Sequence, residues 1–173
     1  GAILQAWYPG QQGGKAVAEV LFGDYNPAGK LPVTFYRNVS QLPDFEDYNM
    51  TGRTYRYMQD VPLFPFGYGL SYTTFGYGKT VLDKNELTAG QSLKLTVPVT
   101  NTGKRNGEEV VQVYLRKQGD AEGPIKTLRA FKRVSIPAGK TVNVEFDLKD
   151  KELEWWDDQS NTVRVCPGNY DIM

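Results

Sequence analysis

The stretch LKLTVPVT, residues 93–100, alternates apolar side chains with polar or lysine side chains at nearly every position. The same period of two returns in TVNVEFDL, residues 141–148, and in VQVYL, residues 111–115. Successive side chains of a strand point to opposite faces, so each run predicts a strand with one buried and one wet face. Turn-forming residues separate the runs, as in 101–103 and 137–140. The pattern predicts an antiparallel β-sandwich.

The amino-acid composition excludes several types of β-sandwich and several classes of function. The chain has 173 residues, with one cysteine, Cys166, and no histidine. This excludes disulfides, zinc sites, Cys-His pairs and Ser-His-Asp triads, because each needs residues that the chain lacks. An antibody-type domain needs a cysteine pair, so residues 79–173 are predicted to form a fibronectin type III-like sandwich. The fold class is therefore mainly β.

Charge and hydropathy exclude other partners. Twenty basic residues balance twenty acidic ones, so nothing favours a nucleic-acid or anionic-membrane partner. No apolar run approaches the roughly 18 residues of a membrane span. No signal peptide is seen, and the chain opens as an excised piece would, so its start says nothing about location.

The first 36 residues predict a strand, a helix and a second strand. The run 2–7 is apolar, and 15–22 places Val17, Val20 and Leu21 on one helical face, with Gly23 able to end the helix. Residues 31–35 return as an apolar run after a turn-rich segment. Such a unit belongs at the edge of an α/β sheet but is too short to bury its own core. We interpret residues 1–36 as the tail of a larger α/β sandwich domain.

Residues 37–78 show little periodicity and are rich in proline and aromatic residues. A connector this long is unusual inside one compact domain. It is predicted to be extended, to bridge two domains and to hold itself in place by burying aromatic rings.

One motif needs exclusion. PGQQGGKA, residues 9–16, places glycines before a lysine as phosphate-binding loops do. The phosphate loop needs four residues between its glycines and a hydroxyl after its lysine. Here only three residues separate Gly10 from Gly14, and Ala16 replaces the hydroxyl residue. A tight turn into the helix is the better interpretation.

Several long motifs, taken in order, resemble the C-terminal portion of family-3 glycoside hydrolases of the β-xylosidase and β-glucosidase type. Those resembling the end of the second, α/β domain and the link that follows it are AWYPGQ (6–11), AEVLFGDYNP (18–27), GKLPVTF (29–35) and LFPFGYGLSYTTF (63–75). Those resembling the fibronectin type III-like domain are VPVTNTG (97–103), EEVVQVY (108–114) and PGNY (167–170). LPDFEDY (42–48) and GRTYRY (52–57) are more similar to the xylosidase branch.

The resemblance implies a retaining, exo-acting enzyme that removes β-linked xylose or glucose from oligosaccharides with two carboxyl groups. It places both groups in parts of the enzyme that precede this chain, so the chain is expected to carry no catalytic residue and to be inactive alone. It implies no cofactor and no metal. The expected partners are the remaining N-terminal domains and, through them, the oligosaccharide substrate, with a homo-oligomer as a further option. The expected location is secreted or periplasmic.

The family also has one strand after the PGNY strand, which this chain is expected to lack. Without that strand, the neighbouring strand edge would be unpaired. The apolar side chains of residues 3–21 would also be exposed, so the fragment is predicted to associate with partner chains.

Four residues are candidates for substrate contact. Glu46 lies beside aromatic residues of the connector, and Arg53 and Tyr55 form a polar and aromatic cluster with Arg56. Arginines bonded to backbone carbonyls are the expected alternative for that cluster. Trp156 follows Trp155, and one of two adjacent strand residues must face the core, so packing is expected for at least one. Other adjacent acids (46–47, 108–109, 157–158) would point apart on a strand and are expected to be solvated or in turns.

Three functions remain open at this point: part of an exo-glycosidase, a carbohydrate-binding module, or a structural module that braces catalytic domains or mediates oligomerisation. A binding module would show a row of exposed aromatic residues, and only the tryptophan pair is visible.

Overall fold

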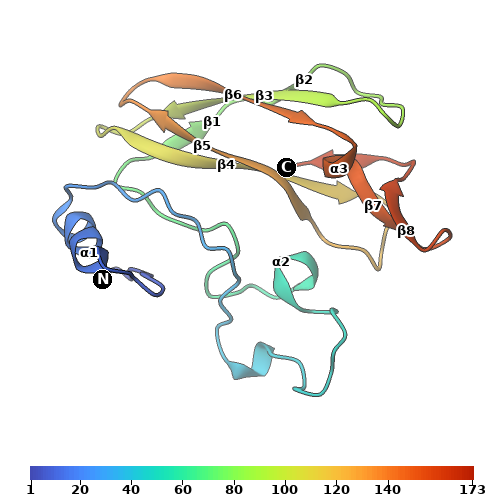
Figure 1. The fold of residues 1–173 in the computed structure, drawn as a ribbon, viewed down its shortest axis with the longest axis horizontal. Coiled ribbons are helices and arrows are strands. Elements are labelled where there is room, and N and C mark those ends of the chain that lie inside the picture. Colours follow the sequence, from blue (N-terminus) through green and yellow to red (C-terminus); the bar gives the residue numbers. More distant parts are fainter.

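The computed structural model describes residues 1–173 and shows a β-sandwich with a second, thinner lobe beneath it (Figure 1). One sheet has β3 (Leu93–Asn101) at its centre. It pairs with β6 (Thr141–Leu148) on one side and with β1 (Phe75–Tyr77) and β2 (Val81–Leu82) on the other. All these pairings are antiparallel.

The second sheet has the order β5-β4-β9. It contains β5 (Thr127–Ile136), β4 (Gly107–Lys117) and β9 (Tyr170–Ile172), again antiparallel. A short helix, α3 (Asp150–Leu153), leads into the separate hairpin of β7 (Glu154–Asp157) and β8 (Thr162–Val165). The mainly β class and the fibronectin type III-like sandwich are confirmed.

The core lies between the two sheets and follows the predicted alternation. One cluster contains the buried apolar side chains that β3, β4, β5 and β6 direct between the sheets: Leu93, Leu95, Val97, Val99, Val111, Val113, Ile136, Val144, Phe146 and Leu148. A smaller cluster joins Leu115, Trp155 and Cys166 beneath the hairpin. Burial of these side chains is the main stabilising term for the sandwich.

Asn101 is a polar residue inside this apolar core, with no exposed surface. Its amide donates to the carbonyls of Arg105 (2.8 Å) and Ile136 (2.9 Å). Its oxygen accepts from the Thr73 hydroxyl (2.6 Å) and the Gly103 N–H (3.1 Å). A buried amide is tolerated when its hydrogen bonds are made, and these bonds tie the segment that enters the sandwich to the β3–β4 turn.

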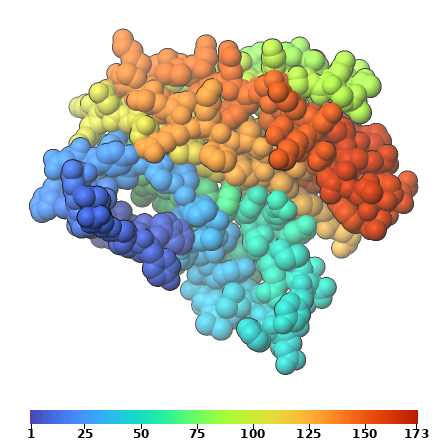
Figure 2. Space-filling model, in the orientation of Figure 1, coloured from blue at the N-terminus to red at the C-terminus, as the bar shows by residue number.

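Residues 1–72 form the second lobe, with blue to teal atoms in Figure 2. They contain α1 (Gly13–Phe22), the 3₁₀ helix η1 (Val39–Gln41) and α2 (Thr54–Tyr57). The predicted helix is confirmed, and Gly23 ends it at φ 83°, a left-handed conformation that suits glycine.

The two strands predicted around this helix are wrong for this structure. Residues 2–7 make no ladder with any segment, and a strand persists only with a neighbour to accept its hydrogen bonds. Residues 31–35 run beside 63–68, with Leu31 N–H donating to Tyr68 and Phe35 N–H to Phe64 (both 2.8 Å). Only the Phe35–Phe64 bridge is regular, and no backbone hydrogen bond joins Val33 to Phe66 to continue the ladder toward Leu31.

Candidate functional site

The second sheet holds the lobe of residues 1–72 through its outer face and one of its edges. The turn after α1 contributes Tyr25, whose hydroxyl accepts from Arg133 on β5 (2.6 Å). Arg133 also pairs with Glu108 on β4. Asn26 donates to the Asn106 carbonyl (3.0 Å) and accepts from the Tyr72 N–H (2.7 Å). These contacts link three segments that are distant in the sequence.

A largely buried ion pair between Lys30 and Glu109 joins this lobe to the sandwich. Lys30 Nζ lies 3.1 Å from the Glu109 carboxylate and donates to the Gly69 carbonyl (3.0 Å). The Tyr77 hydroxyl donates to the same carboxylate (3.0 Å). Burial, together with the charge of Glu109, raises the pKa of Tyr77 well above its usual value, so its proton stays in place to donate. Paired and hydrogen-bonded in this way, the Glu109 charge is compensated inside the protein.

This arrangement corrects the expectation that the adjacent acids are solvated. Glu108 faces outward to Arg133, while Glu109 is buried at 7% exposure. The two do diverge, as strand geometry requires. The signal for Glu109 was present, since extending the alternation of Val111 and Val113 back by two residues puts it on the core face.

An aromatic anchor holds the connector further along β4. Tyr55 stacks on Phe66, with ring centroids 4.1 Å apart, and meets the Tyr114 ring edge to face at 5.9 Å. Its hydroxyl accepts from the Leu128 N–H (3.0 Å), next to the register shift between β4 and β5. Burial raises the pKa of Tyr114 to about 12, with a smaller contribution from Tyr55. Tyr55 is one of the candidates for substrate contact, and in this structure its ring packs against Phe66 and Tyr114.

Arg53, the next candidate, clamps its own loop. Its Nε donates to the Asn49 carbonyl (2.8 Å), and its Nη2 donates to the carbonyl of Asp47 and to that of Asp44 (3.4 Å). The predicted alternative of arginine bonded to backbone carbonyls describes Arg53. The loop is held further by Asp47, which accepts from the Asn49 N–H (2.9 Å).

Glu46 lies in the turn of this clamped loop, exposed to solvent. Its neighbours Phe45 and Tyr48 are almost fully exposed, at 93% and 89%. Exposed aromatic rings on a fixed loop mark a surface made for contact with another body. The loop therefore carries an exposed carboxylate and two exposed aromatic rings.

Trp155 and Trp156 divide as predicted. Trp155 is buried at 4% exposure, lies under the Arg129 guanidinium at 4.8 Å and donates its indole N–H to Asp120 (3.0 Å). Trp156 is half exposed and donates to Asp158 (2.7 Å). Trp156 stands on the β7–β8 hairpin, whereas Glu46 and Arg53 share a connector loop, so the four candidates form no single site.

Two acidic residues, Asp47 and Asp157, are poorly suited to proton donation. A hydrogen bond from the Asn49 N–H lowers the pKa of Asp47, and a hydrogen bond from Ser160 lowers that of Asp157. A general acid at a glycosidic bond needs a raised pKa. No group of three or more metal-ligating side chains is present. No helix combines the length and apolar character needed to cross a bilayer.

Comparison with known proteins follows this division into two lobes. Residues 1–72 match the glycosyl hydrolase family 3 C-terminal domain, and residues 109–173 match the fibronectin type III-like domain. The chain is 57% identical over 172 residues to a xylan 1,4-β-xylosidase of Xylanibacter ruminicola, covering 99% of this chain and 20% of that protein. It is 40% identical to a periplasmic β-glucosidase of Salmonella typhimurium, covering 99% and 24%.

A solved structure shows the same arrangement. The β-glucosidase of Erythrobacter marinus superimposes with a TM-score of 0.81 at 43% identity, covering 96% of this chain and 22% of that one. The chain thus spans about a fifth to a quarter of the length of the proteins it matches.

Proposed function

Because this chain belongs to glycosyl hydrolase family 3, we propose that it is the bracing part of an exo-acting, retaining β-glycosidase. In this proposal the sandwich fixes residues 1–72, and these complete the catalytic domains that belong to the same polypeptide. The relative with 57% identity acts on xylan-derived chains by its name, which favours β-linked xylose over glucose. The periplasmic relative supports a secreted or periplasmic location.

The observation that carries the proposal is the unequal burial of the two lobes. The sandwich has its own core, whereas among residues 1–72 only Ala28 is buried. Exposed large apolar side chains concentrate in this lobe, including Ile3, Leu4, Leu21 and Phe22. Apolar surface on this scale is normally covered by another body. Covering a few hundred Å² would contribute several kcal/mol at about 25 cal/mol per Å².

The assay for the activity uses the complete protein that contains this chain. We expect nitrophenyl β-xyloside to be hydrolysed with a kcat/KM at least tenfold above that for nitrophenyl β-glucoside. The 173-residue chain alone should hydrolyse neither, because a two-carboxylate mechanism needs both groups. Turnover by the purified chain, or a complete protein inactive on both substrates, would refute the proposal.

Bracing has a separate test at the aromatic anchor. Tyr55→Ala in the complete protein removes the stack on Phe66 and the acceptor for the Leu128 N–H. We expect a shorter half-life of activity on warming with an unchanged KM, because the anchor holds the lobe but does not touch substrate. Phe131→Ala, at an exposed ring on β5 away from the connector loop, is the control for loss of an aromatic side chain. A KM that rises only in the Tyr55 variant would assign this ring to the substrate instead.

The connector loop is the proposed point of contact with the sugar. Glu46, with Phe45 and Tyr48, is fixed by the Arg53 clamp and is free to face the active-site mouth of the complete enzyme. Glu46→Gln should raise KM for a xylo-oligosaccharide more than for the aryl xyloside, whose single sugar does not reach beyond the cleaved bond. Equal effects on both substrates would remove Glu46 from the site.

A further inference from the structure

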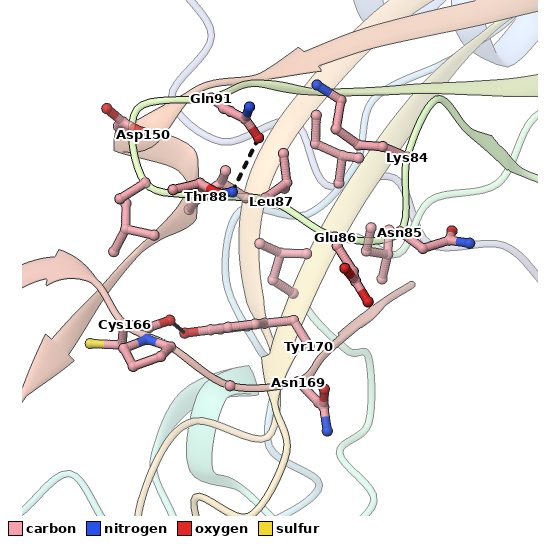
Figure 3. Close-up of a pocket in the computed structure, with 18 of the residues that line it drawn as sticks. Lys84, Asn85, Glu86, Leu87, Thr88, Gln91, Asp150, Cys166, Asn169 and Tyr170 are labelled. Atoms are coloured by element: carbon pink, nitrogen blue, oxygen red, sulfur yellow. Dashed lines mark hydrogen bonds between the residues drawn. The ribbon is translucent and has the colours of Figure 1, made fainter.

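A cavity of about 770 Å³ opens at the end of the sandwich (Figure 3). Four segments surround it: the loop 82–91 between β2 and β3, the end of β4, the helix α3, and residues 165–172. No residue of the lobe 1–72 lines it. β9 runs beside β4 along the wall of the cavity, with Ile172 opposite Leu115.

The inner wall of the cavity is apolar and rigid. Leu93 and Leu115 belong to the buried clusters, and Leu153 and Ile172 pack against them. The volume lies within the range of small-molecule sites, roughly 300–1,000 Å³, and such sites combine an apolar wall with a few polar groups. A pyranose ring has an apolar C–H face that suits this wall.

The rim supplies polar groups. Glu86 comes from the loop, and Asn169 comes from the turn before β9. Figure 3 shows the Glu86 carboxylate directed from its loop toward the segment that carries Asn169 and Tyr170. Both residues are exposed. A carboxylate accepts hydrogen bonds and an amide both donates and accepts, which is the combination that sugar hydroxyls need.

The loop that carries Glu86 is held in place. Thr88 N–H donates to Gln91 (3.1 Å, dashed in Figure 3), and Gly90 N–H donates to Asp150 on α3 (3.1 Å). On the opposite side, Gln118 donates to Asp171 (2.6 Å). A fixed rim lowers the entropy lost when a ligand binds.

The charge of the rim selects against anions. Glu86 and Asp150 are negative, and the positive charge of Lys84 is shared with Asp83 at 3.8 Å. We propose that this cavity is a binding site for a neutral saccharide unit of the polysaccharide on which the complete protein acts. The saccharide class rests on the proposed function, whereas the polarity of the site rests on the residues above. The alternating pattern of the strands did not reveal these polar residues, because the residues around the opening lie in loops.

The test uses affinity electrophoresis of the complete protein in gels containing soluble xylan. We expect wild-type protein to be retarded, and the double variant Glu86→Ala, Asn169→Ala to bind about five- to tenfold more weakly, the effect of losing a few hydrogen bonds to hydroxyls. Glu145→Ala, an exposed acid on β6, is the matched control and should keep wild-type retardation. Thermal midpoints of all three proteins check that they fold.

The kcat/KM on nitrophenyl β-xyloside, measured without xylan, separates the outcomes. Weaker retardation of the double variant with wild-type kcat/KM supports the site. Unchanged retardation, no retardation of the wild-type protein, or parallel loss of retardation and kcat/KM overturns it. If the wild-type protein hydrolyses no xyloside or glucoside, the proposed function fails, while a difference in retardation between the variants still supports a saccharide site.

Discussion

Removing Lys30 from its buried pair should destabilise the chain far more than removing a surface lysine. The side chains of Lys30 and Glu109 keep only 16% and 9% of their exposure. Lys30→Met leaves the Glu109 carboxylate buried with one remaining partner, the Tyr77 hydroxyl. Breaking a buried pair in this way costs about 3–5 kcal/mol. We take about 3 kcal/mol, since the tyrosine still compensates part of the charge.

Thermal unfolding of the 173-residue chain, followed by circular dichroism, measures this cost. About 3 kcal/mol corresponds to a fall in Tm of roughly 6–12 °C for a chain of this size. Lys15→Met is the control, because the Lys15–Glu19 pair is 3.7 Å apart with side chains 70% and 41% exposed. Such exposed helix pairs contribute about 0.3–0.5 kcal/mol.

The double variant Lys30→Met, Glu109→Leu completes the experiment. Replacing both charges by apolar side chains removes the unpaired charge, so stability should return to near the wild-type value or exceed it. The reasoning is refuted if Lys30→Met behaves like the Lys15 control. It is refuted equally if the double variant is as unstable as the sum of its single changes.

The remaining predictions concern buried and half-buried side chains of the sandwich. Trp155→Ala should lower the free energy of unfolding in urea by about 3–5 kcal/mol, because the side chain is buried and hydrogen-bonded to Asp120. Trp156→Ala, at a half-exposed site, should lower it by only about 0.5 kcal/mol. Equal losses would contradict the structure. Asn101→Ala should cost about 3 kcal/mol in the same assay, since two buried carbonyls lose their donor, and a neutral result would refute this role. The pKa of Tyr114 is raised from 10.0 to about 12, so the folded state holds this proton more tightly than the unfolded state. The stability that this proton contributes is fully present below pH 10 and should be lost as pH rises from about 10 to 12. Tyr114→Phe should lose less stability than the wild-type chain in that window, and identical pH profiles would contradict the assignment.

The sequence alone determined the strands whose signal is local. The alternation in 93–99 and 141–148 identifies β3 and β6 and their buried faces, because a half-buried strand must place every second side chain in the core. The adjacent tryptophans could be divided into one buried and one exposed for the same reason. Gly23 was recognisable as the end of α1, since the left-handed backbone there favours glycine.

Tertiary structure alone decided what depends on a distant neighbour. Residues 2–7 and 31–35 are apolar enough for strands, but a strand exists only where another backbone pairs with it, and here the first has no partner and the second has an interrupted one. The partner of Glu109 lies 79 residues away at Lys30, and no pattern along the chain joins the two. The cavity beside Glu86 and Asn169 is likewise assembled from four separate segments. Periodicity reports the face on which a side chain lies, whereas pairing, docking and cavities depend on how segments far apart in the chain meet in space.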